Sequence, residues 1–195
     1  MSKILKLILA LFLTLLILIS YLSLVGIETK KFNNQNISKI KNINQNLDIE
    51  LKKIKINLDP FNLRANLKTI NPKLEFKNRI IEIENIKSQI SLKSLIQNKF
   101  AIENLEISTK SLELKNLVRF TNSINRKPEL FILEKIIKKG YLIADIKLEF
   151  DDKGKIKENY EINGFIRDTK LSFLKKYNIE KLNFIFGYKK DVVKL

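Results

Sequence analysis

The feature that most constrains this chain is an uncharged apolar segment near its N-terminus. Residues 7–27 read LILALFLTLLILISYLSLVGI and contain no Asp, Glu, Lys or Arg. At about 1.5 Å per residue, a helix of this length measures roughly 30 Å, the thickness of the hydrocarbon core of a bilayer. The segment is apolar on every side, whereas a helix on the surface of a soluble domain keeps a polar face. The sequence therefore predicts a transmembrane anchor over residues 1–27.

A cleavable signal peptide is the competing interpretation of this segment. Its apolar region is usually about 7–15 residues long, and no A-x-A-like site follows here, although small residues such as Ser20 and Ser23 occur. Lys3 and Lys6 favour a cytoplasmic N-terminus, while Lys30 on the other flank pulls the opposite way. Because large domains translocate largely regardless of charge, we expect a single-pass protein with its N-terminus in the cytoplasm.

The rest of the chain divides into a polar stretch and a region of short strands. Residues 28–46 predict a polar linker or a short amphipathic helix. From residue 47 to residue 195 the apolar residues recur with period two, and turn dipeptides such as Asp59-Pro60 interrupt them. The sequence PELFILEKIIKKG, from Pro128 to Gly140, has the start and stop signals of a helix. Strands over 142–150 and 156–166 flank the turn DDKG. We expect a mainly β domain with one or two short helices.

One strand carries a fault in its alternation. Phe100 and Ile102 fall on one parity, and Leu105 and Ile107 fall on the other, with the change at Glu103-Asn104. An extra residue of this kind predicts a β-bulge, which bends a strand. The bend favours a curved antiparallel sheet shaped as an open groove. A closed sandwich, in which a second sheet covers the apolar face, is the alternative that the pattern leaves open.

The composition excludes most catalytic chemistry. The chain has no Cys and no His, so disulfides, Cys–His zinc sites and Ser-His-Asp triads are excluded. Glu82 and Glu84 share a strand face that we expect to be solvated. The acidic residues Asp145, Glu149, Asp151 and Asp152 lack the spacing of a calcium loop. We expect no enzyme activity, no catalytic residue, no metal and no cofactor.

The net charge of +16 raises the question of nucleic-acid binding. Only five of the 37 basic residues are Arg, the residue that reads bases and phosphates bidentately. The lysines are scattered over every segment instead of forming one block. We therefore expect no nucleic-acid partner, and a basic surface near anionic lipid headgroups fits the composition better.

Two segments resemble the AsmA-like family. The first, SLKSLIQNKFAIENLEI over residues 91–107, matches a family pattern of the form S-L-x-S-L-L followed by I-x-I-x-x-L-x-I. The second is GYLIADIKLEFDDKGKIKENYEINGFIRDTKL over residues 140–171. The resemblance implies an anchor in the bacterial inner membrane and a periplasmic β domain over residues 47–195. Family members are usually several times longer, so a fragment, a short member and an accessory protein all remain open.

The resemblance also implies a function. An apolar groove would carry phospholipid between membranes during outer-membrane biogenesis, without enzyme activity or cofactor. Its partners would be membrane phospholipids and other envelope proteins. The alternatives are a single-span β-jellyroll component of lipopolysaccharide transport and an assembly factor of the envelope that binds no lipid. The apolar side chains expected to line the groove are Phe61, Leu63, Phe100, Ile102, Leu105, Ile107, Ile146, Leu148, Phe150, Ile162, Phe184 and Phe186.

Overall fold

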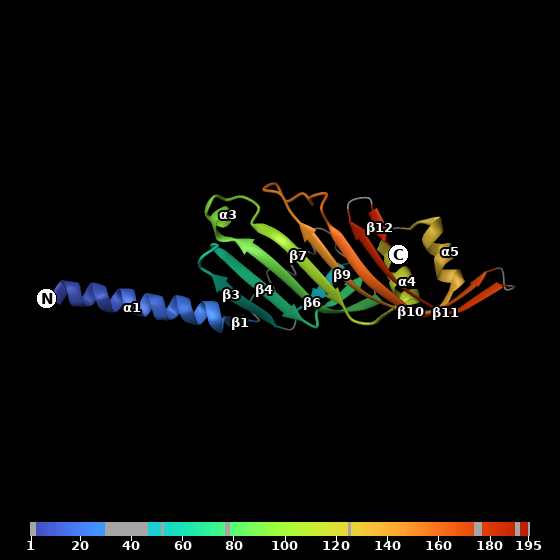
Figure 1. Cartoon of the computed structure of the whole chain (residues 1–195), viewed down its shortest axis with the longest axis horizontal. Coiled ribbons are helices and arrows are strands. Elements are labelled where there is room, and N and C mark those ends of the chain that lie inside the picture. The colour runs from blue at the N-terminus through green and yellow to red at the C-terminus, as the bar shows by residue number, and fades with distance from the viewer. Residues whose placement is uncertain are drawn as a thin grey trace.

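The computed structural model describes residues 3–29, 47–51, 53–76, 79–124, 126–173, 177–189 and 192–194. A long N-terminal helix is followed by an open, mainly antiparallel sheet with three short helices (Figure 1). The helices are α1 (Lys3–Leu24), α3 (Leu92–Ile96), α4 (Leu114–Ile124) and α5 (Pro128–Ile136). The strands are β1 (Ile27–Thr29), β2 (Leu47–Glu50), β3 (Ile54–Asp59), β4 (Arg64–Ile70), β5 (Lys73–Phe76), β6 (Arg79–Ser91), β7 (Ile102–Thr109), β8 (Leu112–Glu113), β9 (Ile137–Glu149), β10 (Glu161–Phe173), β11 (Tyr177–Lys189) and β12 (Val192–Lys194).

The strands lie side by side in the order β1-β3-β4-β6-β7-β9-β10-β11-β12, and every pairing is antiparallel. The first and last strands of this order do not pair, so the sheet is open, and the closed sandwich is excluded. Strands β2 and β5 form a small extension on the first half of β6. Figure 1 shows the strands stacked along the long axis of the molecule, with α1 at one end and α5 toward the other.

Helix α1 is long and apolar enough to cross a membrane, and none of its residues is buried. It joins the sheet through Gly26, which is buried with φ +75°. A Cβ at this position would lie 2.5 Å from the main-chain oxygen of Ile56. In addition, Asn57 Nδ2 donates to the main-chain oxygen of Ser23 over 3.3 Å. The end of α1 is therefore fixed against β3.

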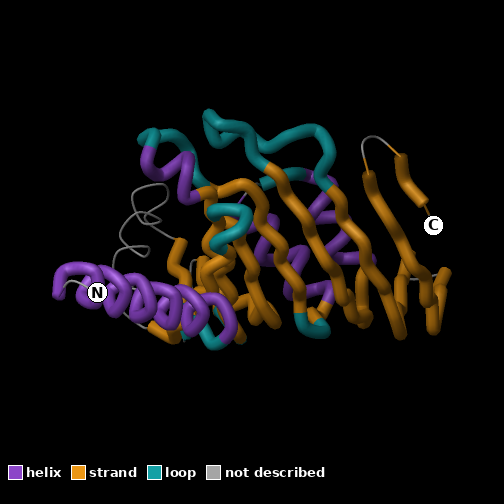
Figure 2. The backbone as a smooth tube through the Cα atoms, turned by 60° about the vertical axis from the view of Figure 1, so that its left-hand side comes forward, coloured by secondary structure: helices purple, strands orange, loops and turns teal. Residues whose placement is uncertain are grey.

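The core lies on one side of the sheet, which we call the inner face. Figure 2 shows α4 and α5 on this side of the strands. One buried cluster joins Phe76, Ile81 and Ile83 to Phe120 of α4. A second cluster joins Leu114 and Val118 of α4 to Ile137 at the start of β9. Burial of this kind is worth about 1.5–3 kcal/mol for each large apolar side chain. The two clusters fasten α4 over one end of the strands.

Helix α4 was not expected from the sequence. The segment from Leu112 to Leu114 continues the alternating pattern of the strands, but β8 ends at Glu113 and a helix follows. Leu114, Leu117 and Val118 have the i, i+3, i+4 spacing that marks the apolar face of a helix. That spacing was the feature of the sequence from which α4 could have been predicted.

Helix α5 begins at Pro128 as expected but ends at Ile136, so Gly140 does not end it. Gly140 lies inside β9 with φ +144°. A Cβ there would lie 2.6 Å from Thr169 Oγ1 and 2.7 Å from Leu114 Cδ1. Glycine is needed because β10 and α4 approach the backbone closely. Of the expected linker, Glu28 and Thr29 belong to β1, and residues 30–46 lie outside the described residues.

Candidate functional site: an apolar face without a cover

The bulge expected in the strand around residue 103 is present. Ile102 pairs with Ile90, Asn104 with Gln89 and Leu105 with Ser88, so Glu103 is the extra residue. Ile102, Leu105 and Ile107 therefore project from the same face in spite of their opposite parities in the sequence. Without the bulge, Ile102 and Leu105 would point to opposite sides of the sheet.

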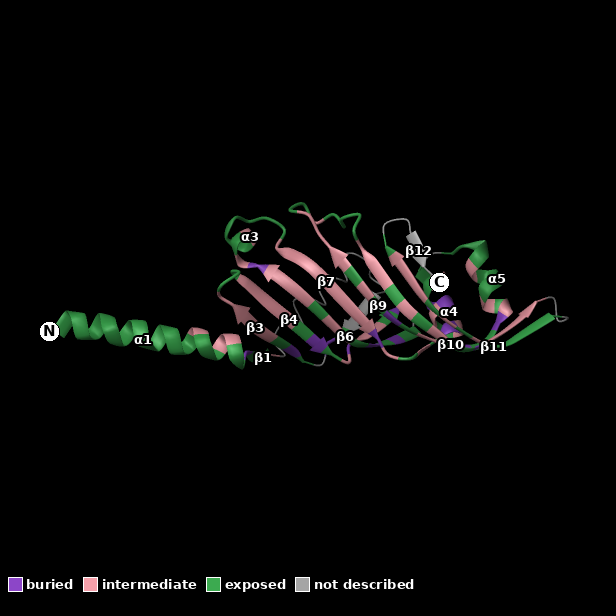
Figure 3. Cartoon of the chain, viewed as in Figure 1, coloured by how far each residue is buried: buried purple, intermediate pink, exposed green. Residues whose placement is uncertain are grey.

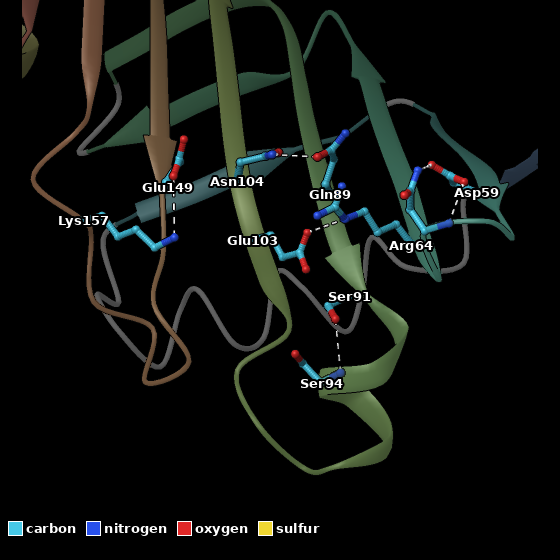
Figure 4. Close-up of polar contacts among 10 residues, drawn as sticks. Asp59, Arg64, Gln89, Ser91, Ser94, Glu103, Asn104, Glu149 and Lys157 are labelled. Atoms are coloured by element: carbon cyan, nitrogen blue, oxygen red, sulfur yellow. Dashed lines mark hydrogen bonds and ion pairs between the residues drawn. The ribbon is translucent and has the colours of Figure 1, made fainter.

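Polar contacts accompany the bulge on the opposite face of the strands (Figure 4). Arg64 of β4 reaches past β6, and its Nε lies 2.6 Å from Glu103 Oε2. Asn104 Nδ2 donates to Gln89 Oε1 over 2.7 Å. The side chains that break the alternation are therefore paired with β4 and β6 on the outer side of the sheet.

Register aligns the inward apolar residues in rows across the sheet. One row runs through Ile86, Ile107, Ile146 and Ile162 on β6, β7, β9 and β10. The next row contains Ile56, Leu67, Leu105 and Leu148, with Ser88 between Leu67 and Leu105. Cross-strand neighbours of this kind have Cβ atoms about 4.5–5.5 Å apart, so each row forms an apolar stripe, which Ser88 interrupts in the second row.

Part of the inner face has no cover among the described residues. We define the open face as the inward Ile, Leu and Phe side chains between β3 and Ile162 of β10 that stay half-buried and belong to neither buried cluster. Figure 3 shows most of the strand area at this intermediate exposure, with buried segments toward one end of the strands and on α4. The residues of the open face are Ile56, Leu58, Leu67, Ile90, Ile102, Leu105, Ile146, Leu148, Phe150 and Ile162.

Aromatic side chains border the open face. The Phe100 ring lies 5.6 Å from the Phe150 ring, measured between centroids. Phe100 also lies against Gly154, where a Cβ would be 2.9 Å from the Phe100 ring. Farther along the sheet, Tyr160 stacks on Tyr188 at 5.4 Å, and their hydroxyl groups are 3.1 Å apart.

The structure brings most of the expected groove residues together. Ile102, Leu105, Ile146, Leu148, Phe150 and Ile162 belong to the open face, and Phe100 lies at its border. Ile107, Phe184 and Phe186 point to the same side: Ile107 packs against the buried cluster that contains Phe120 of α4, and Phe184 and Phe186 are half-buried on β11. Phe61 and Leu63 do not, because they lie in the turn between β3 and β4, where Phe61 is 95% exposed. The segment was expected to be a strand, but Asp59 accepts hydrogen bonds from the Asn62 main chain and side chain and closes a turn there.

Several residues of the open face were not predicted from the sequence. Ile56, Leu58 and Leu67 fall in alternating runs of the sequence but were not expected to line a groove, and Ile90 was not singled out at all. Ser88 is the unexpected polar member of this surface, and its buried Oγ has no hydrogen-bond partner among the described residues. The signal for these positions was the shared period of two on neighbouring strands, but their pairing is set by the turns between them.

The outer face is charged, in contrast to the inner one. A cross-strand row runs through Lys55, Lys68, Lys87, Glu106, Lys147, Glu161 and Lys189. Lys87 Nζ lies 3.6 Å from Glu106 Oε2. A hydrogen bond from Lys189 lowers the pKa of Glu161 and raises that of Lys189. The sheet therefore has a solvated side and an apolar side.

The expected acidic candidates are used in local structure. Asp151 closes the DDKG turn by accepting from the main-chain N–H groups of Lys153 and Lys155, both over 2.9 Å. These hydrogen bonds lower the pKa of Asp151, with that from Lys155 as the largest cause. Glu82 is exposed and lies 3.4 Å from Lys110 Nζ.

No protein-family model matches the sequence, and no matching curated protein or solved structure was found.

Proposed function

We propose that the chain is a membrane-anchored, non-enzymatic protein that holds phospholipid acyl chains on its open face and passes them along the sheet. The observation that carries this proposal is the open face itself, a set of aligned Ile, Leu and Phe side chains that belongs to neither of the clusters buried under α4 and α5. An apolar surface of this kind on a soluble domain marks a contact with lipid, ligand or protein. An acyl chain placed on it would gain about 0.8 kcal/mol per buried methylene.

The direction of the strand stack supports transport as well as binding. Adjacent strands lie about 4.8 Å apart, and they follow one another away from the end of α1 (Figure 1). An acyl chain that moves from strand to strand would therefore move away from the membrane that holds α1. In the setting that we propose, α1 is a single-pass anchor in a bacterial inner membrane, the N-terminus is cytoplasmic and the sheet is periplasmic.

Site-specific crosslinking tests the proposal on the full-length chain. A photocrosslinking amino acid at Leu105 on the open face should form an adduct with the mass of a phospholipid in cells. The same amino acid at Lys147 is the matched control, because Lys147 lies on an adjacent strand and is exposed on the outer face. Capture of protein alone at Leu105, or equal lipid capture at both positions, would contradict the proposal.

A second candidate function rests on the edge of the sheet. Strand β12 pairs only with Gly187–Lys189 of β11. Residues 177–186 of β11 have no further neighbour among the described strands, and an exposed edge can accept a strand from another protein. This would suit an envelope assembly factor. Crosslinking from Tyr177, which is exposed, would then capture a protein, whereas Leu105 would capture no lipid.

A further inference from the structure

Most of the arginines of this chain line a single cavity of about 570 Å³. The sequence has five arginines, at positions 64, 79, 119, 126 and 167. Three of them, Arg79, Arg119 and Arg126, line this cavity together with Lys127. The side chains come from the start of β6, from α4 and from the segment between α4 and α5. Segments far apart in the sequence thus bring four cations to one hollow.

One of these four cations is paired within the cavity, and the other three form no ion pair with the described residues. Glu134 is the one carboxylate among the lining residues, and it pairs with Arg119, whose Nε lies 2.8 Å from Glu134 Oε1. Arg79 and Arg126 are exposed and form no ion pair with the described residues. Arginine presents a planar set of donors that fits phosphate bidentately. The cavity therefore has the charge and the donors of a phosphate site.

The N-terminus of α5 adds to the positive field at the same place. Lys127 is the N-cap residue of α5, and its side chain makes no capping hydrogen bond. Pro128 and Phe131, on the first turns of this helix, also line the cavity. The start of a helix carries partial positive charge from its free N–H groups, which favours a bound anion.

A second, apolar cavity adjoins the first. Its volume is about 720 Å³, and it shares Arg119, Phe131 and Glu134 with the arginine-lined cavity. Most of its lining surface is apolar and comes from Phe131, Ile132 and Ile136 of α5 and from Phe173 at the end of β10, while Lys115, Lys135 and Lys138 also line it. Phe131 and Ile132 are 52% and 54% exposed. Both volumes lie within the range of about 300–1,000 Å³ that is usual for small-molecule sites.

We propose that the two adjoining cavities form one binding site for an acyl lipid whose headgroup is a phosphate monoester, which carries net negative charge toward the unpaired arginines. The phosphate is held by Arg79 and Arg126, and an acyl chain lies along Ile132 and Phe173. This occupant fits because the charged and the apolar cavities share three lining residues, as the two ends of an amphiphile require. The site has no residue in common with the open face, so it goes beyond the function proposed above.

Binding to the full-length chain in neutral maltoside micelles tests this site. The ligands are dioctanoyl phosphatidate, dioctanoyl phosphatidylcholine and inorganic phosphate, measured by native mass spectrometry and by calorimetry. Phosphatidate should bind tightest. The double variant Arg79→Gln/Arg126→Gln should weaken it by at least about 10-fold, because each hydrogen bond between charged groups contributes about 1.5–3 kcal/mol and 1.4 kcal/mol is a factor of ten.

Matched variants separate the two parts of the site. Arg167→Gln is the charge control, because Arg167 is an exposed arginine on β10 that lies outside both cavities. Ile132→Asn should weaken phosphatidate without changing the binding of inorganic phosphate. Ile185→Asn, on the exposed outer face of β11, should change neither. Arg126→Gln alone carries the charge test if the double variant does not fold.

The outcomes that would overturn the proposal are distinct. Equal affinity for phosphatidate and phosphatidylcholine would remove the role of the arginines. Inorganic phosphate that binds as tightly as phosphatidate would make the cavity a site for the free ion. An acidic protein captured by a photocrosslinker at Ile132, with no lipid, would make it a protein interface. Leu105→Asp should leave phosphatidate binding intact even if it abolishes lipid capture on the open face.

Discussion

Arg64 Nε lies 2.6 Å from Glu103 Oε2, so the extra residue of the β7 bulge is held from β4, across the intervening β6. Both side chains are more than a third exposed. Exposed ion pairs contribute only about 0–1 kcal/mol, so this pair cannot by itself stabilise the bend strongly. We infer that the inward packing of Ile102 and Leu105 sets the bulge and that the ion pair occupies the space outside it.

Two single-residue deletions in β7 should have opposite consequences. Deleting Glu103 removes the extra residue and leaves Ile102, Leu105 and Ile107 on one face of a regular strand, so the chain should still fold. Deleting Glu106 reverses the facing of Ile102 and Leu105 relative to Ile107 and should cost roughly 1–3 kcal/mol for each reversed side chain. Chemical denaturation of the two variants measures the difference. Equal destabilisation would contradict the role given to Glu103.

Truncations on the inner face should separate the core from the open face. Ile83 is 3% exposed and belongs to a buried cluster, so Ile83→Ala should lower the free energy of unfolding by about 2–5 kcal/mol. Leu105→Ala should cost less, because Leu105 is half-buried beside an uncovered surface. The same variant should reduce the phospholipid that co-purifies, whereas Ile83→Ala should not change the amount bound per folded molecule. The reverse order of stabilities would show that the open face is part of the core.

Gly164 gives a test of how tightly β10 packs against β11. A Cβ at position 164 would lie 2.5 Å from Phe186 Cζ, so Gly164→Ala should cost about 1–3 kcal/mol through overpacking. Phe186→Leu shortens the opposing side chain and should recover part of this loss in the double variant. A double-mutant cycle in urea measures the coupling. Strict additivity of the two changes would contradict the contact.

The pairing of Glu161 with Lys189 on the outer face should make the stability of the protein depend on pH. The hydrogen bond from Lys189 lowers the pKa of Glu161 below its ordinary 4.5, so its stabilisation is complete above that pH and is lost as the pH falls through the lowered value. The Lys189 pKa is raised above its ordinary 10.5, so the stabilisation is complete below that pH and is lost as the pH rises through the raised value. Glu161→Gln should therefore lower Tm relative to wild type at pH 7 but not at pH 2. Glu158→Gln, in the exposed loop before β10, is the control.

Much of the fold could be predicted from periodicity, because the strands have one apolar and one polar face. The runs around Leu148, Ile162 and Phe184 alternate, and each lies in a strand of the expected sheet. The bulge at Glu103 was also predictable, since a change of parity inside one strand leaves few other solutions. The position of the N-terminal helix followed from its length and lack of charge alone.

The errors have a shared physical origin in tertiary contacts. The segment of Phe61 and Leu63 alternates like a strand, but the hydrogen bonds that Asp59 accepts close a turn there. The sequence predicts a helix end at Gly140. Glycine is instead required there because Thr169 and Leu114 lie too close to the backbone for a Cβ atom. The two cavities between α4 and α5 could not be found from sequence, because Arg79 and Phe173 reach them from distant strands.

The joint at Gly26 has a mechanical consequence. The backbone of Gly26 lies against Ile56, and Asn57 is hydrogen-bonded to the end of α1, so the helix and the first strands turn together. A spanning helix tilts when the bilayer is thinner than its apolar length. Such a tilt would swing the whole sheet through the same angle. The orientation of the sheet relative to the bilayer would thus depend on the thickness of that bilayer.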